Sequence, residues 1–420
     1  MHVAATAGVR VPRASAYVAT FAALTLIACN GCSSSDDDAA SADGRAPRAV
    51  LGPTPDDAGP DKLHVPPRSI RAAARWDLGD SSAAARGEPD PELAPFQIIG
   101  RVDRRDPAGP RFGWPGSQLR ARFSGTGVSL DLEDTGTSHY DVVIDEAAPV
   151  RLIVSGPRKT YDLVVSQTKL EHEIVLTKRT ETFVGITQVR GVAAHAGGAL
   201  IPTRPPRGRR IEVIGDSITC GFGVLGADET CPFSPDTESE PLAWGALAAA
   251  ALSATRTTIA ASGIGVLRNF AGDTDGTMPD LYGRALATDP ASTPDQFFVP
   301  DVVVVNLGTN DFAGGKGDPG PAFVDKYTRL LATLRARHPK AKIVAATSPM
   351  LGEPNRTTLR TYLEAALKAR GAAGDTKLTL LDLDEQSTAD GLGCGYHPSQ
   401  WTQQKMAAKL VAHLRAINGW

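Results

Sequence analysis

The pattern of apolar residues predicts an all-β sandwich followed by an α/β domain. Between about residues 95 and 202, short segments that alternate apolar and polar residues recur between Gly, Pro and Asp turns, as is typical of a sandwich. From residue 211 onward, apolar strand-like segments alternate with longer helix-like ones. Such alternation indicates a parallel sheet with helices on both faces. The segment Thr-Arg-Pro-Pro-Arg-Gly-Arg-Arg at 203–210, which its prolines extend, marks a linker between the two parts.

The first 28 residues resemble an export signal. Arg10 and Arg13 precede an apolar run that is too short to span a membrane comfortably and suits the core of a signal peptide. The run ends in Leu26-Ile-Ala-Cys29, which resembles a bacterial lipobox. We therefore expect cleavage after residue 28, lipidation of Cys29, and an extracytoplasmic protein that is anchored to the cell envelope. A plain secretory signal is the alternative.

Composition separates a tether from the folded domains. Residues 29–92 contain few apolar residues and many Ser, Asp, Ala and Pro, so we expect a disordered tether with at most a short helix around 69–75. The sandwich then covers residues 93–205 and the α/β domain covers 206–420. The whole chain has 42% hydrophobic residues and a net charge of -3. This charge gives no reason to expect nucleic acid as a partner.

Each domain is assigned from its own set of segments. The sandwich strands are expected at 96–100, 119–123, 128–132, 140–144, 150–154, 161–165, 173–176 and 183–186. The parallel strands are expected at 211–214, 256–260, 302–307, 342–346 and 378–383. The helices are expected at 241–254, 321–338, 357–370 and 398–417, three of them with a proline in the first turn.

Four candidate site residues follow the ends of these parallel strands. They are Ser217 after the first strand, Gly263 after the second, Asn310 after the third and His397 beyond the fifth. In a flavodoxin-like strand order the first and third strands are neighbours, and ligands bind at the carboxyl edge where they meet. We therefore expect these residues to converge in one crevice.

Their chemistry fits acyl transfer. A serine hydroxyl needs a base within hydrogen-bonding reach, and His397 is the candidate base for Ser217. The backbone N–H groups of Ser217 and Gly263 and the side-chain amide of Asn310 are candidate oxyanion donors. Each motif alone also suits an ordinary turn or helix cap. The joint pattern favours catalysis.

The motifs resemble those of a known superfamily. The sequences Gly-Asp-Ser-Ile-Thr at 215–219, Ser-Gly-Ile-Gly at 262–265, Gly-Thr-Asn-Asp at 308–311 and His-Pro at 397–398 resemble the blocks of SGNH (GDSL-like) hydrolases. The segments 114–117, 122–126, 177–181 and 216–221 further resemble carbohydrate esterase family 2.

The resemblance implies a fold and an activity. It implies a jelly-roll-like sandwich packed against a flavodoxin-like SGNH hydrolase domain. The implied substrates are acetylated oligo- or polysaccharides such as xylan or mannan, from which acetyl groups are removed without a metal or an organic cofactor.

One position departs from the superfamily pattern. An aspartate usually stands three residues before the histidine, but here that residue is Cys394, and the nearest acid is Asp390. Two arrangements stay open. In one, Asp390 completes a triad; in the other, which the narrower family implies, a backbone carbonyl orients His397 in a Ser–His dyad.

Export also implies an oxidising compartment, in which cysteines pair. Cys220, Cys231 and Cys394 all lie in the catalytic half, and the Cys220–Cys231 pair is our first choice because it closes a short loop.

Two other functions remain as alternatives. One is hydrolysis of a lipid or thioester acyl group by the same machinery, and the other is a non-catalytic glycan-binding lipoprotein.

Overall fold

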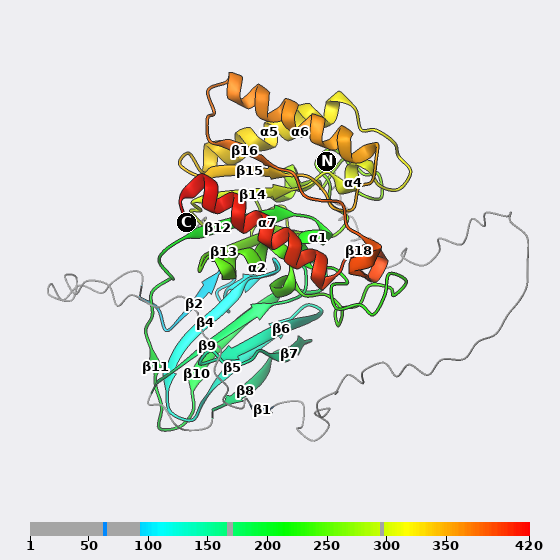
Figure 1. The fold of residues 1–420 in the computed structure, drawn as a ribbon. Helices are drawn as coiled ribbons and strands as arrows, with labels where there is room; N and C mark the ends of the chain where they lie inside the picture. The colour runs from blue at the N-terminus through cyan, green and yellow to red at the C-terminus, as the bar shows by residue number, and fades with distance from the viewer. Residues whose placement is uncertain (1–61, 65–92, 166–170, 295–297) are drawn as a thin grey trace, which may run out of the picture. The chain divides into compact units, whose positions relative to one another are not determined.

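Two packed sheets build the first domain (Figure 1). The computed structural model describes residues 62–64, 93–165, 171–294 and 298–420, which belong to one compact unit. The predicted signal peptide, Cys29 and the 69–75 helix lie outside the described residues. Within the predicted tether, Lys62–His64 form strand β1, which pairs in parallel with β8.

The two sheets of the sandwich have different strand orders. One sheet has the order β1-β8-β5-β10-β3, and the other has the order β11-β4-β9-β6-β7 with β2 paired to β4. The strands are β2 (Phe96–Ile99), β3 (Arg111–Phe112), β4 (Gln118–Ser124), β5 (Gly127–Asp134), β6 (Thr137–Ile144), β7 (Val150–Ser155), β8 (Lys159–Val164), β9 (Glu171–Lys178), β10 (Thr187–Ala194) and β11 (Leu200–Ile201).

Burial alternates along these strands, as half-buried strands require. In β4 every second residue is buried, and Leu119, Ala121 and Phe123 join the core between the sheets. One predicted strand is wrong. Residues 183–186 lie in a turn region before β10, and Phe183 is exposed. The apolar side chain of Phe183 fitted the alternation expected of a strand, but the chain there forms the turn between β9 and β10.

The second domain has the predicted parallel sheet, so the α/β fold class is confirmed. Its order is β13-β12-β14-β15-β16, with every neighbouring pair parallel. The strands are β12 (Arg210–Gly215), β13 (Thr255–Ala260), β14 (Val302–Asn306), β15 (Lys342–Ala346) and β16 (Leu378–Leu381). The central strand β14 is an uninterrupted valine run that ends in Asn306 and is buried on both faces.

Helices cover both faces of this sheet (Figure 1). Val302 and Val304 pack in the cluster that includes α2 (Trp244–Ala251) and α7 (Gln400–Asn418). Val303 and Val305 pack in the cluster that includes α5 (Pro321–Arg337) and α6 (Asn355–Ala372). The strand's period of two thus sends alternate valines to opposite helix layers.

The helix starts differ in detail from the predicted ones. The expected 241–254 helix is a short 3₁₀ turn, η2 (Glu240–Leu242), and then α2, because Ala243 between them is extended. The last helix begins at Gln400 because the Ser399 hydroxyl caps it. Among the described residues, no helix is both long and apolar enough to cross a membrane.

Short elements complete the domain. They are α1 (Ser217–Cys220), α3 (Met278–Leu281), α4 (Thr309–Phe312), η3 (Thr388–Asp390), β17 (Leu392–Gly393), η4 (Cys394–Tyr396) and β18 (His397–Pro398).

Candidate active site

Ser217 lies where β12 turns sharply into α1. The Asp216 carboxylate caps this helix by accepting the Ile218 N–H at 3.0 Å. Only glycine fits at position 215, since a Cβ there would lie 2.1 Å from the Thr219 hydroxyl oxygen. The tight turn therefore holds Ser217 at the carboxyl edge of the sheet, with its side chain almost buried.

His397 faces this serine. Its Nε2 lies 2.7 Å from the Ser217 Oγ. Its Nδ1 lies 3.1 Å from the carbonyl oxygen of Cys394 and 3.0 Å from that of Gly395. Because carbonyls only accept hydrogen bonds, Nδ1 carries the proton and Nε2 presents its lone pair to the serine hydroxyl. The Phe222 ring stacks on the imidazole at 4.2 Å between centroids.

Burial keeps this imidazole neutral. It lowers the pKa of His397 to about 4, although the two carbonyl hydrogen bonds favour the charged form. A neutral imidazole at neutral pH is ready to accept a proton from Ser217.

Asp390 does not take the position that a triad requires. Both oxygens of its carboxylate accept from the Lys405 ammonium, at 2.7 and 2.8 Å. The Nδ1 of His397 instead faces the two carbonyls. The structure thus corrects the Asp390-assisted arrangement, because η3 turns this carboxylate toward α7.

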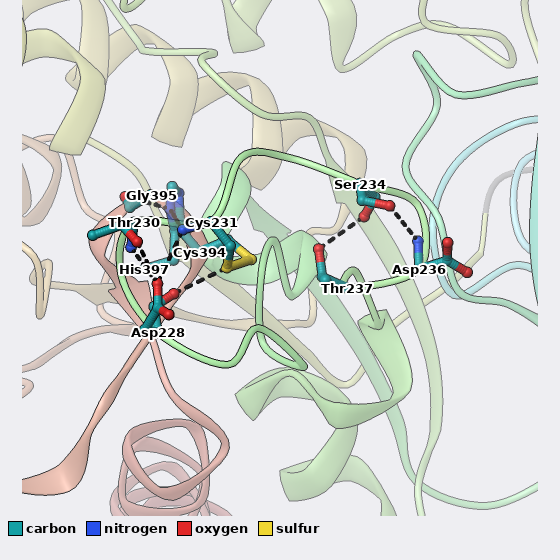
Figure 2. Close-up of a disulfide and its surroundings, with 9 residues drawn as sticks. All are labelled: Asp228, Thr230, Cys231, Ser234, Asp236, Thr237, Cys394, Gly395 and His397. Atoms are coloured by element: carbon teal, nitrogen blue, oxygen red, sulfur yellow. Dashed lines mark hydrogen bonds between the residues drawn. A yellow bond between two sulfur atoms is a disulfide. The ribbon is translucent and has the colours of Figure 1, made fainter.

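The disulfide differs from the first choice made from sequence. Cys231 bonds to Cys394 (Figure 2). Cys220 is a buried free thiol in α1. The loop that carries Cys231 is organised by Asp228, whose carboxylate accepts from the Thr230 N–H at 2.8 Å and its hydroxyl at 2.7 Å. The disulfide therefore ties this loop to the residue whose carbonyl faces His397.

The loop after β13 contains the candidate oxyanion glycine. Gly263 has a positive φ of 76°, which favours glycine. Asp311 accepts the N–H groups of Val266, Leu267 and Arg268 at 2.7–3.0 Å.

The N–H groups nearer Gly263 are also bonded. Those of Ser262, Ile264 and Gly265 are accepted by Glu181, Ala261 and Asn269, respectively. Within the described part of the chain, the N–H of Gly263 is the one in this run from 262 to 268 without an acceptor. That is the property expected of an oxyanion donor.

Asn310 lies in α4, after β14, and its amide touches both other parts of the site. Its Nδ2 donates to the Ile264 carbonyl at 3.0 Å and to the Asp216 carboxylate at 3.3 Å. Burial raises the pKa of Asp216 to about 7. Asn310 is thus hydrogen-bonded both to the turn that carries Ser217 and to the loop that carries Gly263, and both of its amide hydrogens are used.

Sequence reasoning missed several contributors. The carbonyls of Cys394 and Gly395 are backbone groups, which residue types do not reveal. Asp311 was noted only as part of a motif, and Glu181 only as part of a resemblance. Glu181, Cys220 and Glu238 bring three ligand-type atoms within 4.8 Å of one another. Buried Lys178 interacts electrostatically with both Glu181 and Glu238 and so takes the place that a cation would have. We therefore assign no metal to this cluster.

Comparison with known families agrees with this architecture. Residues 98–205 match the family described as carbohydrate esterase 2 N-terminal. Residues 213–405 match the GDSL-like lipase/acylhydrolase family. The fold and the site therefore define an ester hydrolase of the GDSL type that is preceded by a carbohydrate esterase sandwich.

Individual relatives narrow the class. A family two carbohydrate esterase from Clostridium thermocellum, solved in complex with cellohexaose, is 33% identical, covers 77% of this chain and 99% of its own, and superposes with a TM-score of 0.73. The cellulase/esterase CelE of Acetivibrio thermocellus is 32% identical over 79% of this chain. An acetylxylan esterase/glucomannan deacetylase of Cellvibrio japonicus is 28% identical over 79% of this chain and 90% of its own length.

The chain belongs to carbohydrate esterase family 2. It spans 40% of the length of CelE.

Proposed function

We propose that this protein removes O-acetyl groups from acetylated sugars or polysaccharides, with Ser217 as nucleophile and His397 as general base. The observation that carries the proposal is the 2.7 Å contact between the Ser217 Oγ and the His397 Nε2. The deacetylase name of the Cellvibrio japonicus relative supports the substrate class. Xylan-like and mannan-like polysaccharides are the proposed substrates.

The proposed reaction has two halves. The Ser217 Oγ attacks the acetyl carbonyl carbon while its proton moves to the His397 Nε2. The resulting imidazolium then gives this proton to the sugar oxygen as the ester bond breaks, leaving an acetyl-serine. Water, deprotonated by the same Nε2, attacks the acetyl-serine carbonyl carbon. The bond from this carbon to the Ser217 Oγ then breaks, the imidazolium returns its proton to this Oγ, and acetate leaves.

Negative charge on the acetyl oxygen needs donors. The N–H groups of Ser217 and Gly263 and the amide of Asn310 are the proposed oxyanion hole. Asn310 would exchange its longer contact, the 3.3 Å bond to Asp216, for the oxyanion. Removing one such donor typically costs about a hundred- to a thousand-fold in rate.

The carbonyls of Cys394 and Gly395 are proposed to replace the orienting aspartate. They accept hydrogen bonds from Nδ1–H, fix the tautomer and stabilise the transient imidazolium through their dipoles. In this proposal the enzyme is a Ser–His dyad in which Asp390 has no chemical role.

Acetate release is the direct test. Acetylated xylan, acetylated glucomannan and simple sugar acetates are assayed with the wild type and with Ser217→Ala. We expect release from at least one polysaccharide and loss of release in the variant. Unchanged release by Ser217→Ala would favour a non-catalytic, glycan-binding role for the protein. Faster hydrolysis of 4-nitrophenyl octanoate than of the acetate would favour the lipid or thioester alternative.

We also propose that the protein is exported and anchored by a lipid on Cys29. The support is the Leu26-Ile-Ala-Cys29 sequence after an apolar run. Labelling with radioactive palmitate in a bacterial host, with Cys29→Ser as control, tests this. Equal labelling of both proteins would overturn the lipidation site.

A further inference from the structure

A buried polar turn of the sandwich reaches the catalytic loops. Residues 178–182, Lys-Arg-Thr-Glu-Thr, are all buried although all five are polar. Burial of this kind is costly unless each group is hydrogen-bonded. The turn lies against residues 238–240 of the hydrolase domain, where the Glu240 N–H donates to the Arg179 carbonyl at 3.0 Å. The turn is thus a bonded part of the contact between the domains.

Glu181 makes hydrogen bonds to the hydrolase domain through both its backbone and its side chain. The Glu238 carboxylate accepts the backbone N–H of Glu181 at 3.0 Å. The Glu181 carboxylate in turn accepts the backbone N–H of Ser262 at 2.7 Å. Both hydrogen bonds end on buried carboxyl oxygens, and burial raises the pKa of both glutamates.

The surrounding charges fit this arrangement. The Lys178 ammonium donates to the carbonyls of Thr180 and Glu181 at 2.9 and 3.0 Å. It places a positive charge beside two buried glutamates, Glu181 and Glu238. Cys220 lies at the end of the helix that starts with Ser217. Its sulfur is within 4.8 Å of a carboxylate oxygen of Glu181 and of one of Glu238. Glu181 thus lies between the nucleophile helix and the loop after β13.

The peptide that Glu181 fixes is directly before the candidate oxyanion donor. Ser262 precedes Gly263, whose N–H is left without an acceptor among the described residues. Asp311 fixes the far end of the same loop through Val266, Leu267 and Arg268. Glu181 is therefore the anchor at the near end, and it comes from the other domain.

We propose that Glu181 is a positioning residue for the oxyanion hole, so that the β-sandwich completes the hydrolase site. This proposal rests on the proposed function. Without the Glu181 carboxylate, the Ser262–Gly263 peptide loses its anchor, and the Gly263 N–H no longer points reliably at the developing oxyanion. Ground-state binding of the ester does not depend on this donor, so the loss falls on kcat.

The experiment compares Glu181→Ala and Glu181→Gln in the full chain. The amide oxygen of glutamine can still accept the Ser262 N–H, so Glu181→Gln is the rescue variant. Arg151→Ala is the matched control, because Arg151 also joins the sandwich to the hydrolase domain, through Asp236 at 2.8 Å, but it is exposed and its recorded hydrogen bonds go to Asp236 rather than to the loop after β13. The readouts are kcat and KM for 4-nitrophenyl acetate and the Ki of phenylboronic acid, whose tetrahedral serine adduct mimics the intermediate.

We expect Glu181→Ala to lower kcat by about tenfold or more and to raise the Ki of the boronate in parallel, with KM within about twofold. Glu181→Gln and Arg151→Ala should stay near the wild type. A kcat that falls while the boronate Ki stays constant would mean fewer folded molecules and would overturn the proposal, as would an unchanged kcat.

Two further arms keep the test decisive. If Glu181→Ala does not fold, Glu181→Asp replaces it, since its shorter side chain keeps the carboxyl group but falls short of the Ser262 N–H; the same expectations apply. Ser217→Ala is measured alongside. Unchanged activity in Ser217→Ala defeats the proposed function itself, whereas loss in Ser217→Ala with no effect in the Glu181 series defeats only the role of Glu181.

Discussion

The Nδ1 of His397 lies 3.1 Å from the carbonyl oxygen of Cys394, three residues earlier in the chain. The superfamily resemblance places an aspartate side chain at position 394. Here the cysteine side chain is tied to Cys231, and the backbone carbonyl faces the imidazole instead. A carbonyl dipole stabilises an imidazolium less than a full negative charge does. Burial, which leaves the imidazole neutral, is consistent with a base that works without a carboxylate.

Asp390→Asn tests whether the carboxylate takes part in catalysis. Since its oxygens bind Lys405, we expect kcat to stay within about twofold of the wild type, whereas His397→Ala should lower kcat by about 10⁴-fold. Steady-state rates on 4-nitrophenyl acetate measure both. Lys405→Met is the matched control for loss of the ion pair. A tenfold loss in Asp390→Asn that is absent from Lys405→Met would restore the triad.

The acid limb of the pH profile reports on His397. Burial lowers its pKa to about 4, so the imidazole is neutral above that pH and Nε2 is free to accept a proton. Below it, Nε2 is protonated and cannot act as a base. We expect kcat/KM to be flat toward neutral pH and to fall about tenfold per unit below about pH 4. Return to pH 7 after each assay separates titration from unfolding; a midpoint near 6.5 would contradict the buried, neutral base.

Much of the hydrolase domain was predictable because its signals are local. The valine run of β14 is apolar at every position, as a strand buried on both faces must be. The meeting of Ser217 and His397 was predictable because both were expected at the carboxyl edge of the parallel sheet, where the ends of its strands come together. The turn at 183–186 was not predictable, because Phe183 is apolar, as a strand residue would be, although it is exposed.

Contacts between segments far apart in the chain could not be predicted from the sequence. The disulfide joins residues separated by 163 positions, and its choice depends on where the β17–β18 hairpin places Cys394. The Glu181 contact with Ser262 crosses the two domains. Neither follows from periodicity or residue type, because both depend on how independently folded elements pack.

The Cys231–Cys394 disulfide should affect both stability and rate. We expect Cys231→Ser with Cys394→Ser to lose about 2–5 kcal/mol of unfolding free energy because the unfolded chain is no longer cross-linked. We also expect kcat to fall by about tenfold, since the segment that presents the Cys394 carbonyl is less constrained. Urea denaturation and steady-state rates measure the two effects. Dithiothreitol should lower the rate of the wild type but not of the double variant, and an equal response would refute this coupling.

Arg101 and Glu212 form a buried ion pair between the two domains, with 3.5 Å between a guanidinium nitrogen and a carboxylate oxygen. Tyr282 also donates its hydroxyl to this carboxylate at 2.5 Å. Arg101→Met leaves the carboxylate buried without its cation, so we expect a loss of about 3–5 kcal/mol in unfolding free energy at pH 7. Arg158→Met, which removes an exposed arginine from the same domain, should leave the unfolding free energy nearly unchanged.

The pH dependence of this loss has a definite sign. Burial alone would raise the pKa of Glu212, but the hydrogen bond from His338, the charge of Arg101 and the hydrogen bond from Tyr282 together lower it below its usual 4.5. A lowered carboxyl pKa stabilises the fold above pH 4.5, and this contribution is lost as the pH falls through the folded-state value. The difference between wild type and Arg101→Met should therefore shrink as the pH falls below 4.5. Urea titrations at pH 7, 5 and 4 measure it, and a difference that is constant or grows toward low pH would show that Arg101 acts through packing rather than through the charge of Glu212.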